Sequence, residues 1–309
     1  MSNIDEIYEE DLNSFPDLKT YISDLTKLEN YDFKNCTQEQ IYNIYYDFAK
    51  ILPTNIGWFS PEKFNSHKYY RVRLNIDRTK EDITLAQTYS YPPPKFCFEN
   101  GRANIIGKSV FYCSNDPNAS MLECKPKIND EGFLTVWNGI AKRPIKIGQL
   151  LPFDLPNENI WNLMAKDCFE HSIKTLPEQS KDKFQHFMAL YKFIAHIFVT
   201  EKKPYHLTSM ISWELLYGQL WRDFIIYPSV PSESQFCNMA FHPNSVNENL
   251  QFDKIIKFKV VGFDDNGPKF NLGKKVGIIE NTKMIWRDRT NDETNLFKKQ
   301  TEKPAGNNS

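Results

Sequence analysis

The sequence lacks the patterns that mark several common classes of protein. Its six cysteines include no C-x-x-C pair, so neither a zinc site nor a disulfide framework is indicated, and we expect reduced, mostly buried thiols. None of the six histidines stands at metal-ligand spacing from another, so we predict no metal site. No apolar run approaches the roughly 18 residues of a membrane helix, and the acidic start MSNIDEIYEED is unlike a signal peptide. We therefore expect a cytoplasmic protein with no membrane partner.

An excess of positive charge is also missing, because 38 Lys and Arg residues stand against 39 Asp and Glu residues. Nucleic acids attract proteins mainly through basic surfaces, and no basic cluster stands out, so we expect no nucleic-acid partner. The segment GPKFNLGKK (residues 267–275) has the wrong glycine spacing for a phosphate-binding loop and is typical of a hairpin. No G-x-S-x-G motif surrounds Ser229, so Ser229 is not predicted to be an acylation nucleophile.

The sequence does contain enough apolar and aromatic residues for one large domain or two small ones. Thr37 and Gln40 form a capping box before apolar residues at helical spacing, and residues 1–62 are predicted to be an N-terminal helical extension. Residues 158–200 are predicted to be a helical insertion, and the second of its two helices has an apolar face typical of core packing. Thr208 is predicted to cap a further helix.

Several segments have the alternation of strands. Residues 69–76, YYRVRLNI, predict a strand with two arginines on one face and two apolar residues on the other. Residues 89–107 are rich in proline and glycine and predict a loop. Short strands are expected within 133–150, and longer ones at 252–263 and 268–286, joined at the turn sequence DDNG. The polar end of the chain, 288–309, is predicted to be a disordered tail.

The stretch VFYCSNDPNASMLE, residues 110–123, predicts a strand, a turn and a helix. Asp116 is suited to cap the helix and Pro117 to be its first residue. Because the helix runs back beside the strand, Tyr112 and Glu123 are placed to line one cleft, and the free N–H groups at the helix start would favour a phosphate there. The plainer alternative is that Tyr112 is a half-buried strand residue and Glu123 is solvated.

Short motifs occur in one order along the chain: YRVR at 70–73, GRAN at 101–104, Tyr112 with Glu123 eleven residues later, and YPS at 227–229 with Asn238 after it. Together they resemble the RES domain, a family named for its arginine, glutamate and serine, over roughly residues 65–265. The resemblance implies four catalytic residues, Arg71, Tyr112, Glu123 and Ser229. It implies as substrate-binding residues Arg73, Arg102, Asn104 and Asn238.

The fold that the resemblance implies is α/β (α+β), a compact mixed-sheet core similar to the ADP-ribosyltransferase toxins. The core would span residues 63–287, with the N-terminal helices and the helical insertion as additions. RES proteins are toxins that consume NAD as a substrate, with no other cofactor, by cleaving the nicotinamide–ribose bond with water or phosphate as acceptor. Two alternatives stay open, a protein ADP-ribosyltransferase and a catalytically inactive binding module. The implied partners are NAD, an inhibitory antitoxin or other regulatory partner, and a second copy of the chain in a homo-oligomer.

The residue types suit this chemistry. A guanidinium such as that of Arg71 forms two parallel hydrogen bonds with a phosphate or ribose group, which a lysine cannot reproduce. A carboxylate at Glu123 would stabilise the positive charge that develops on the ribose as nicotinamide leaves. Tyr112 would stack on the nicotinamide ring, and Ser229 would bind the nicotinamide amide or a phosphate oxygen. The structural alternatives are an exposed strand arginine at Arg71 and a serine that satisfies a backbone group at Ser229.

Overall fold

The chain divides into two units, each built from segments that are distant in the sequence. The computed structural model describes residues 15–51, 56–174, 183–264, 267–280 and 283–295. Unit 1 comprises Met1–Trp58, Pro93–Ser109 and Lys146–Pro228, and unit 2 comprises Phe59–Pro92, Val110–Ile145 and Ser229–Ser309. These units do not coincide with the linear segments 1–62, 63–287 and 288–309 that the sequence suggested.

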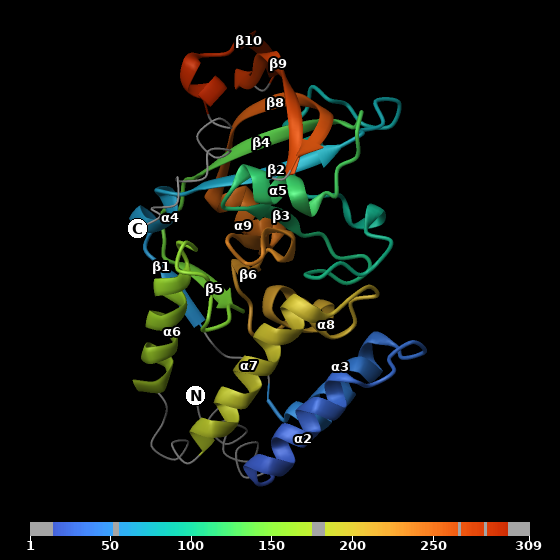
Figure 1. Cartoon of the computed structure of the whole chain (residues 1–309), viewed down its shortest axis with the longest axis vertical. Helices are drawn as coiled ribbons and strands as arrows, with labels where there is room; N and C mark the ends of the chain where they lie inside the picture. Colours follow the sequence, from blue (N-terminus) through green and yellow to red (C-terminus); the bar gives the residue numbers. More distant parts are fainter. Residues whose placement is uncertain (1–14, 52–55, 175–182, 265–266, 281–282, 296–309) are drawn as a thin grey trace. The chain divides into compact units, whose positions relative to one another are not determined.

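Unit 1 is mainly helical. Its elements are α2 (Leu18–Glu29), α3 (Gln38–Ala49), β1 (Ile56–Phe59), η2 (Pro94–Phe96), β5 (Ile145–Gln149), α6 (Asn162–Lys174), α7 (Phe184–Thr200), α8 (Leu207–Tyr217) and β6 (Phe224–Pro228). Strand β5 lies between β1 and β6 and runs parallel to β6. Helix α2 packs against both α3 and α7 (Figure 1). The predicted N-terminal helices and the predicted helical insertion therefore belong to one unit.

Local capping signals explain where these helices begin. The predicted capping box is confirmed: the Thr37 hydroxyl accepts from the Gln40 N–H at 3.2 Å, and the Gln40 side chain accepts from the Thr37 N–H at 2.8 Å. The cap predicted at Thr208 is wrong, because α8 begins at Leu207 and His206 occupies the cap position, two residues earlier than predicted. There the Glu201 carboxylate accepts from the N–H groups of residues 206–208, each at 2.9 Å. A carboxylate has two acceptor oxygens and can satisfy several N–H groups that one hydroxyl cannot.

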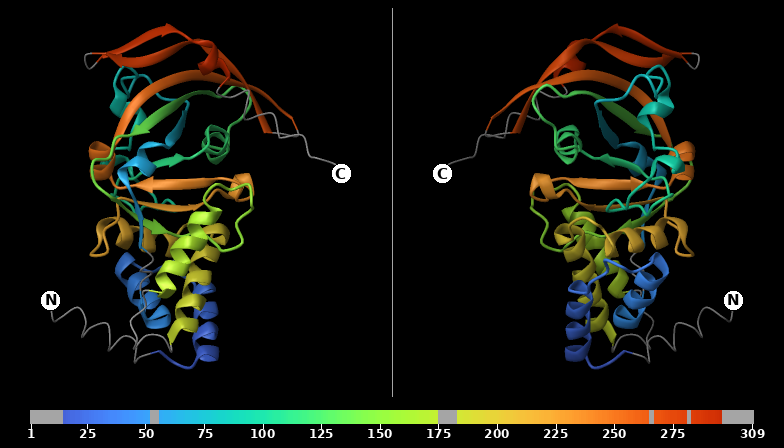
Figure 2. Two further views of the ribbon diagram at one scale, coloured as in Figure 1. Left: turned by 90° about the vertical axis from the view of Figure 1, so that its left-hand side faces the viewer. Right: turned by 90° about the vertical axis from the view of Figure 1, so that its right-hand side faces the viewer.

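Unit 2 is built on an antiparallel sheet with the strand order β7-β3-β2-β4-β8-β9-β10. Its elements are α4 (Pro61–Asn65), β2 (Lys68–Leu74), η1 (Ala86–Tyr89), β3 (Phe111–Ser114), α5 (Pro117–Glu123), β4 (Glu131–Gly139), η4 (Val230–Ser232), β7 (Cys237–Phe241), α9 (Pro243–Asn249), β8 (Leu250–Asp264), β9 (Gly267–Glu280) and β10 (Lys283–Asp288). Strands β8 and β9 are long and strongly curved (Figure 2). With parallel pairing in unit 1 and antiparallel pairing here, the predicted mixed α/β class is confirmed.

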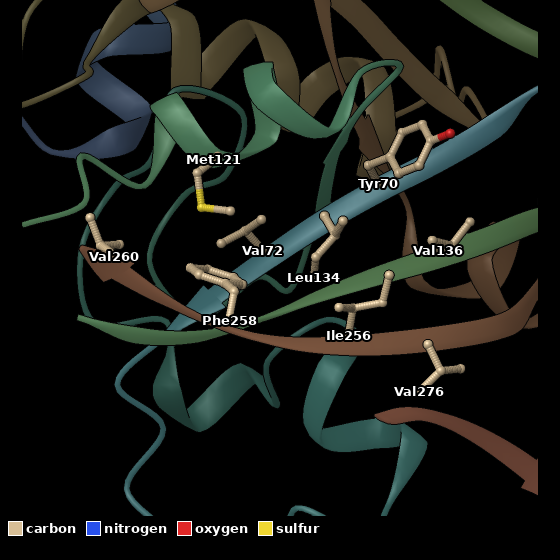
Figure 3. Close-up of a cluster of buried hydrophobic side chains, with 9 residues drawn as sticks. All are labelled: Tyr70, Val72, Met121, Leu134, Val136, Ile256, Phe258, Val260 and Val276. Carbon is tan, nitrogen blue, oxygen red and sulfur yellow. The ribbon is translucent and has the colours of Figure 1, made fainter. Parts of the chain in front are cut away.

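A buried apolar cluster holds α5 against this sheet (Figure 3). Val72 and the other apolar side chains on one face of β2 contact Met121 of α5, as the predicted alternation requires. The ring of Phe258 lies over β4 at Gly132, where any Cβ would come within 2.3 Å of the ring. Because this core anchors α5, it also sets the place of Glu123, the last residue of that helix.

The end of the chain differs from the sequence-based expectation. Residues 268–286 form two strands, β9 and β10, instead of one, and residues 265–266 of the predicted DDNG turn lie outside the described residues. The predicted disordered tail is wrong for 288–295, where residues 291–295 are helical and Glu293 is only 5% exposed. Glu293 pairs with Arg287 at 2.6 Å and with Lys254 at 3.1 Å. The rest of that prediction, 296–309, lies outside the described residues.

Acidification should release this end of the chain. The pKa of Glu293 lies well below its ordinary value of 4.5, chiefly because Arg287 donates hydrogen bonds to it. A carboxyl group with a pKa depressed by folding stabilises the folded state above its unfolded pKa, and this contribution is lost as the pH falls toward the folded pKa. We expect Glu293→Gln to lower the free energy of unfolding by about 1–2 kcal/mol at neutral pH, since partly exposed partners are screened by water.

Urea unfolding at a series of pH values checks this prediction. The wild type should lose stability more steeply than Glu293→Gln between about pH 5 and about pH 3, because only the wild type has this carboxylate to protonate. Parallel pH profiles for the two proteins would contradict the assigned role of Glu293.

Candidate functional site

The carboxylate of Glu123 is held by two residues that are far away in the sequence. Glu123 Oε1 accepts from the Ser229 hydroxyl at 2.7 Å and from the Asn238 side-chain amide at 2.6 Å. In the described part of the chain, no residue donates to the second oxygen, Oε2, and Glu123 as a whole is exposed. One oxygen of the carboxylate is thus anchored, and the other is available to a ligand.

Both donors are themselves firmly placed. Ser229 is fully buried, and its main-chain carbonyl accepts from the Ser232 hydroxyl and the Ser234 N–H, each at 3.0 Å. Asn238 is 7% exposed and lies on β7 directly opposite Ser114 of β3. Two ordered donors restrict the rotation of the Glu123 side chain, although Glu123 is exposed. The Ser229 hydroxyl is thus directed at Glu123, whereas the sequence suggested a direct contact with the substrate.

Arg71 of β2 has no acidic partner among the described residues. Its Nη1 donates to the main-chain carbonyl of Tyr112 at 2.9 Å, and its guanidinium carbon lies 5.5 Å from the centre of the Phe111 ring. The Nε atom is buried and has no hydrogen-bond partner. Burial and then the charge of Arg73 lower the pKa of Arg71 to about 10, so the guanidinium is still charged at neutral pH. The side chain therefore has unused capacity to bind an anion.

Strand register determines how Arg71 and Tyr112 meet. Tyr70 pairs with Ser114, so the side chains of Tyr70, Ser114 and Tyr112 share the face that α5 covers, and Arg71 leaves β2 on the opposite face. The ladder between β2 and β3 consists of this one residue pair. Next to this residue pair, the Arg71 guanidinium donates its hydrogen bond to the main chain of β3. The phenol of Tyr112 is still close enough to contribute to the pKa of Arg71.

Cys124, which the sequence reasoning did not single out, lies within reach of both charged groups. Its thiol donates to the main-chain carbonyl of Val72, the residue after Arg71, at 3.6 Å. Burial raises the pKa of Cys124 to about 11, while Arg71 lowers this pKa and Glu123 raises it. The guanidinium and the carboxylate therefore act on the same partly buried thiol. Its position directly after Glu123 was the only sequence signal that pointed to it.

The paired arginine on β2 has a structural role. Arg73 forms a two-pronged ion pair with Glu81, with Nη2 2.9 Å from Oε1, and it also donates to the Thr88 carbonyl. This pairing neutralises its charge and ties the loop after β2 to the strand. With its donors committed to Glu81 and Thr88, Arg73 supports the fold and is not a candidate for binding the substrate.

The two predicted loop residues belong to unit 1. Arg102 donates to the carbonyl of Phe198 at 2.6 Å, and its guanidinium lies 4.7 Å from the centre of the Tyr205 ring. Asn104 pairs with Gly101 in an isolated bridge, and its side-chain amide donates to the Ile105 carbonyl at 3.1 Å. Within unit 1 these contacts order the loop of residues 93–109.

The phosphate site predicted at the start of α5 is already filled by a side chain. Asp116 caps the helix as predicted, and Pro117 is its first residue. The Asp116 carboxylate accepts from the N–H groups of Asn118 at 2.8 Å and Ala119 at 3.0 Å, and it is 4% exposed. A phosphate there would meet a buried carboxylate instead of free N–H groups, so this part of the prediction is wrong.

Comparison with known proteins does not decide between the possible functions. No family model, curated protein or solved structure matches the chain. No helix in the described ranges is long and apolar enough to cross a bilayer. The function must be inferred from the site itself: an anchored carboxylate, an arginine without an acidic partner, and a tyrosine on the adjacent strand.

Proposed function

We propose that unit 2 binds NAD and cleaves its nicotinamide–ribose bond, with water or phosphate as acceptor, in a fold of the ADP-ribosyltransferase kind. The observation that carries this proposal is the Glu123 carboxylate, fixed at one oxygen by Ser229 and Asn238 and open at the other. The same three residues stand in the RES-like motif order, which supports the assignment. Arg71 has no acidic partner in the described chain, and both its charge and that of Glu123 affect the pKa of Cys124.

The proposed reaction needs a negative charge close to the ribose. As the bond breaks, its electron pair goes to the nicotinamide nitrogen, and positive charge develops on the ribose C1 and ring oxygen. A carboxylate that is already oriented stabilises this charge without reorganising. The acceptor oxygen then bonds to C1 and releases its proton to solvent. In this scheme Glu123 is the catalytic carboxylate, and Ser229 and Asn238 are positioning residues.

Arg71 and Tyr112 complete the proposed site. The unpartnered Nε of Arg71 would donate to the pyrophosphate or a ribose hydroxyl, which supplies the anion contact that a dinucleotide needs. Tyr112 is half-buried on the face of the sheet that α5 covers, where its ring would stack on the nicotinamide. An enzyme that destroys NAD must be restrained in its own cell, so an inhibitory antitoxin or other regulatory partner stays part of the proposal.

Nicotinamide release by the purified chain tests the proposed function. The protein is incubated with NAD carrying a radiolabel in the ADP-ribose part, with and without added phosphate. Free labelled ADP-ribose would identify water as the acceptor, and its phosphate ester would identify phosphate. Label fixed on protein would support the ADP-ribosyltransferase alternative instead. If saturating NAD yields no nicotinamide at all, the proposal is wrong. The alternative of a catalytically inactive binding module is then favoured.

Loss of the Ser229 hydroxyl should slow the reaction without weakening NAD binding. Ser229→Ala removes one of two hydrogen bonds that orient Glu123, so we expect kcat to fall about 10-fold with KM little changed. Asn238→Ala should likewise lower kcat with little change in KM. The double variant should approach the low activity of a variant that lacks the Glu123 charge. Steady-state kinetics separates the two parameters. A rise in KM with unchanged kcat would show instead that Ser229 contacts the substrate.

A further inference from the structure

Arg222 in unit 1 is a buried cation whose position is fixed by its main chain. It lies between α8 and β6, and its N–H donates to the Leu215 carbonyl at 2.7 Å. The whole residue is only 4% exposed. Burial alone lowers the pKa of Arg222 to about 10, so the side chain is charged at neutral pH.

One edge of the Arg222 guanidinium has no hydrogen-bond partner. Nη1 donates to the carbonyl of Trp221 at 3.1 Å, but Nε is buried and unpartnered, and no described residue accepts from Nη2. Nε and Nη2 together form the side-on fork that binds two oxygens of a carboxylate or phosphate. The buried Nε in particular has no acceptor, which is costly for so strong a donor.

Neither of the two neighbouring carboxylates, Asp223 and Glu214, forms an ion pair with Arg222 in the described chain. Asp223 accepts from the N–H of Lys146 at 2.8 Å. Glu214 packs against Gly218, where any Cβ would lie 2.4 Å from its carboxyl carbon. Neither contributes to the pKa of Arg222, for which burial is the one cause.

A second cation lies beside the same segment. The Lys146 ammonium is 5.6 Å from the centre of the Trp221 ring and 5.5 Å from the centre of the Trp58 ring. Among the described residues, it has no acidic partner. Because a buried charge without a counter-charge is strongly destabilising, the unpartnered edge of Arg222 favours the binding of an anion, and the half-buried Lys146 adds a positive charge beside Trp221.

We propose that Arg222 anchors an anion-binding site in unit 1 that takes a small oxyanion group, a phosphate or a carboxylate. The Nε and Nη2 donors bind two of its oxygens side-on, and Lys146 adds positive charge to the surroundings. This site is separate from the candidate site of unit 2 and does not depend on the proposed NAD chemistry.

Thermal unfolding of the full chain tests the proposal. Sodium phosphate and sodium acetate are titrated separately at constant ionic strength, with chloride as the balancing salt. At about 100 times the Kd of the bound anion, the melting temperature of the wild type should rise by about 5 °C. A response to phosphate or to acetate identifies the class of oxyanion that is bound.

Three variants make the test specific. Arg222→Met removes the buried charge, so without added anion it should melt at or above the wild-type temperature, and it should lose the response. Arg222→Lys keeps the positive charge but lacks the two parallel donors, so its affinity for the oxyanion should fall at least about 10-fold. This variant gives a second measurement if the methionine variant does not fold. Arg78→Met, which removes an exposed arginine, should respond like the wild type.

The outcomes of this test are independent of the candidate site in unit 2. Arg71→Met should keep the response, even if phosphate also reacts at the proposed NAD site. Absence of any response in the wild type would overturn the proposal. An equal response in the wild type, Arg222→Met and Arg222→Lys would overturn it as well.

Discussion

Replacing Glu123 by glutamine should lower the rate of nicotinamide release by about 10²-fold or more. The side-chain oxygen of glutamine can still accept from Ser229 and Asn238, so the local hydrogen bonds are kept while the negative charge is lost. The loss should be in kcat, because the charge is needed when the ribose becomes positive and not when NAD binds. Initial rates of nicotinamide release at several NAD concentrations measure this effect.

Thermal unfolding gives the control for Glu123→Gln. Because Glu123 is exposed and its core neighbours are unchanged, the melting temperature should stay close to that of the wild type. Glu280→Gln, which neutralises an exposed glutamate on β9, is the matched variant and should keep full activity. Wild-type rates for Glu123→Gln would remove the carboxylate from the mechanism and with it the proposed function.

Arg71→Met should lower kcat/KM for NAD by about 10²-fold, mainly through a higher KM. Two charge-assisted hydrogen bonds of roughly 1.5 kcal/mol each account for a loss of this size. Arg71→Lys should recover little of it, because an ammonium cannot present two parallel donors to a pyrophosphate. Steady-state kinetics together with the NAD-dependent rise in melting temperature measure activity and binding separately.

The fold should tolerate the loss of Arg71. Arg71 as a whole is half-buried, its Nε is buried without a partner, and it makes one hydrogen bond to a main-chain carbonyl but no ion pair with a described residue, so Arg71→Met should change the melting temperature little in the absence of NAD. Arg78→Lys, in the loop after the same strand, serves as the matched control. A large fall in stability with an unchanged KM would show that Arg71 supports the fold and does not bind the substrate.

Features that depend on neighbours in the sequence were predictable. The capping box of Thr37 and Gln40, the start of α5 at Asp116 and Pro117, and the alternation along β2 all appear in the structure. Each depends on hydrogen bonds or side-chain directions within a few residues of the chain. Over so short a distance the backbone geometry allows few alternatives. Even here local competition mattered, since Glu201 displaced the predicted cap at Thr208.

Contacts across long stretches of sequence were decided by the tertiary structure alone. That Ser229 and Asn238 donate to Glu123 depends on how β7 aligns with β3, more than 100 residues away: the two hydrogen bonds span 106 and 115 residues. The residue types and their order in the sequence identified these three side chains as candidates. They did not show that Ser229 and Asn238 would donate hydrogen bonds to Glu123.

The roles of the arginines were likewise set by packing. Two arginines on one face of a strand look equivalent in the sequence, yet Glu81 pairs with Arg73 and no described carboxylate pairs with Arg71. Arg222 carries no motif, and only its burial without a counter-charge makes it notable. Local helix starts, strand alternation and the types of charged side chain all follow from the amino-acid sequence. Which charges are neutralised and which stay open to a ligand was decided by the fold, because electrostatic pairing depends on distance in space and on exclusion of water.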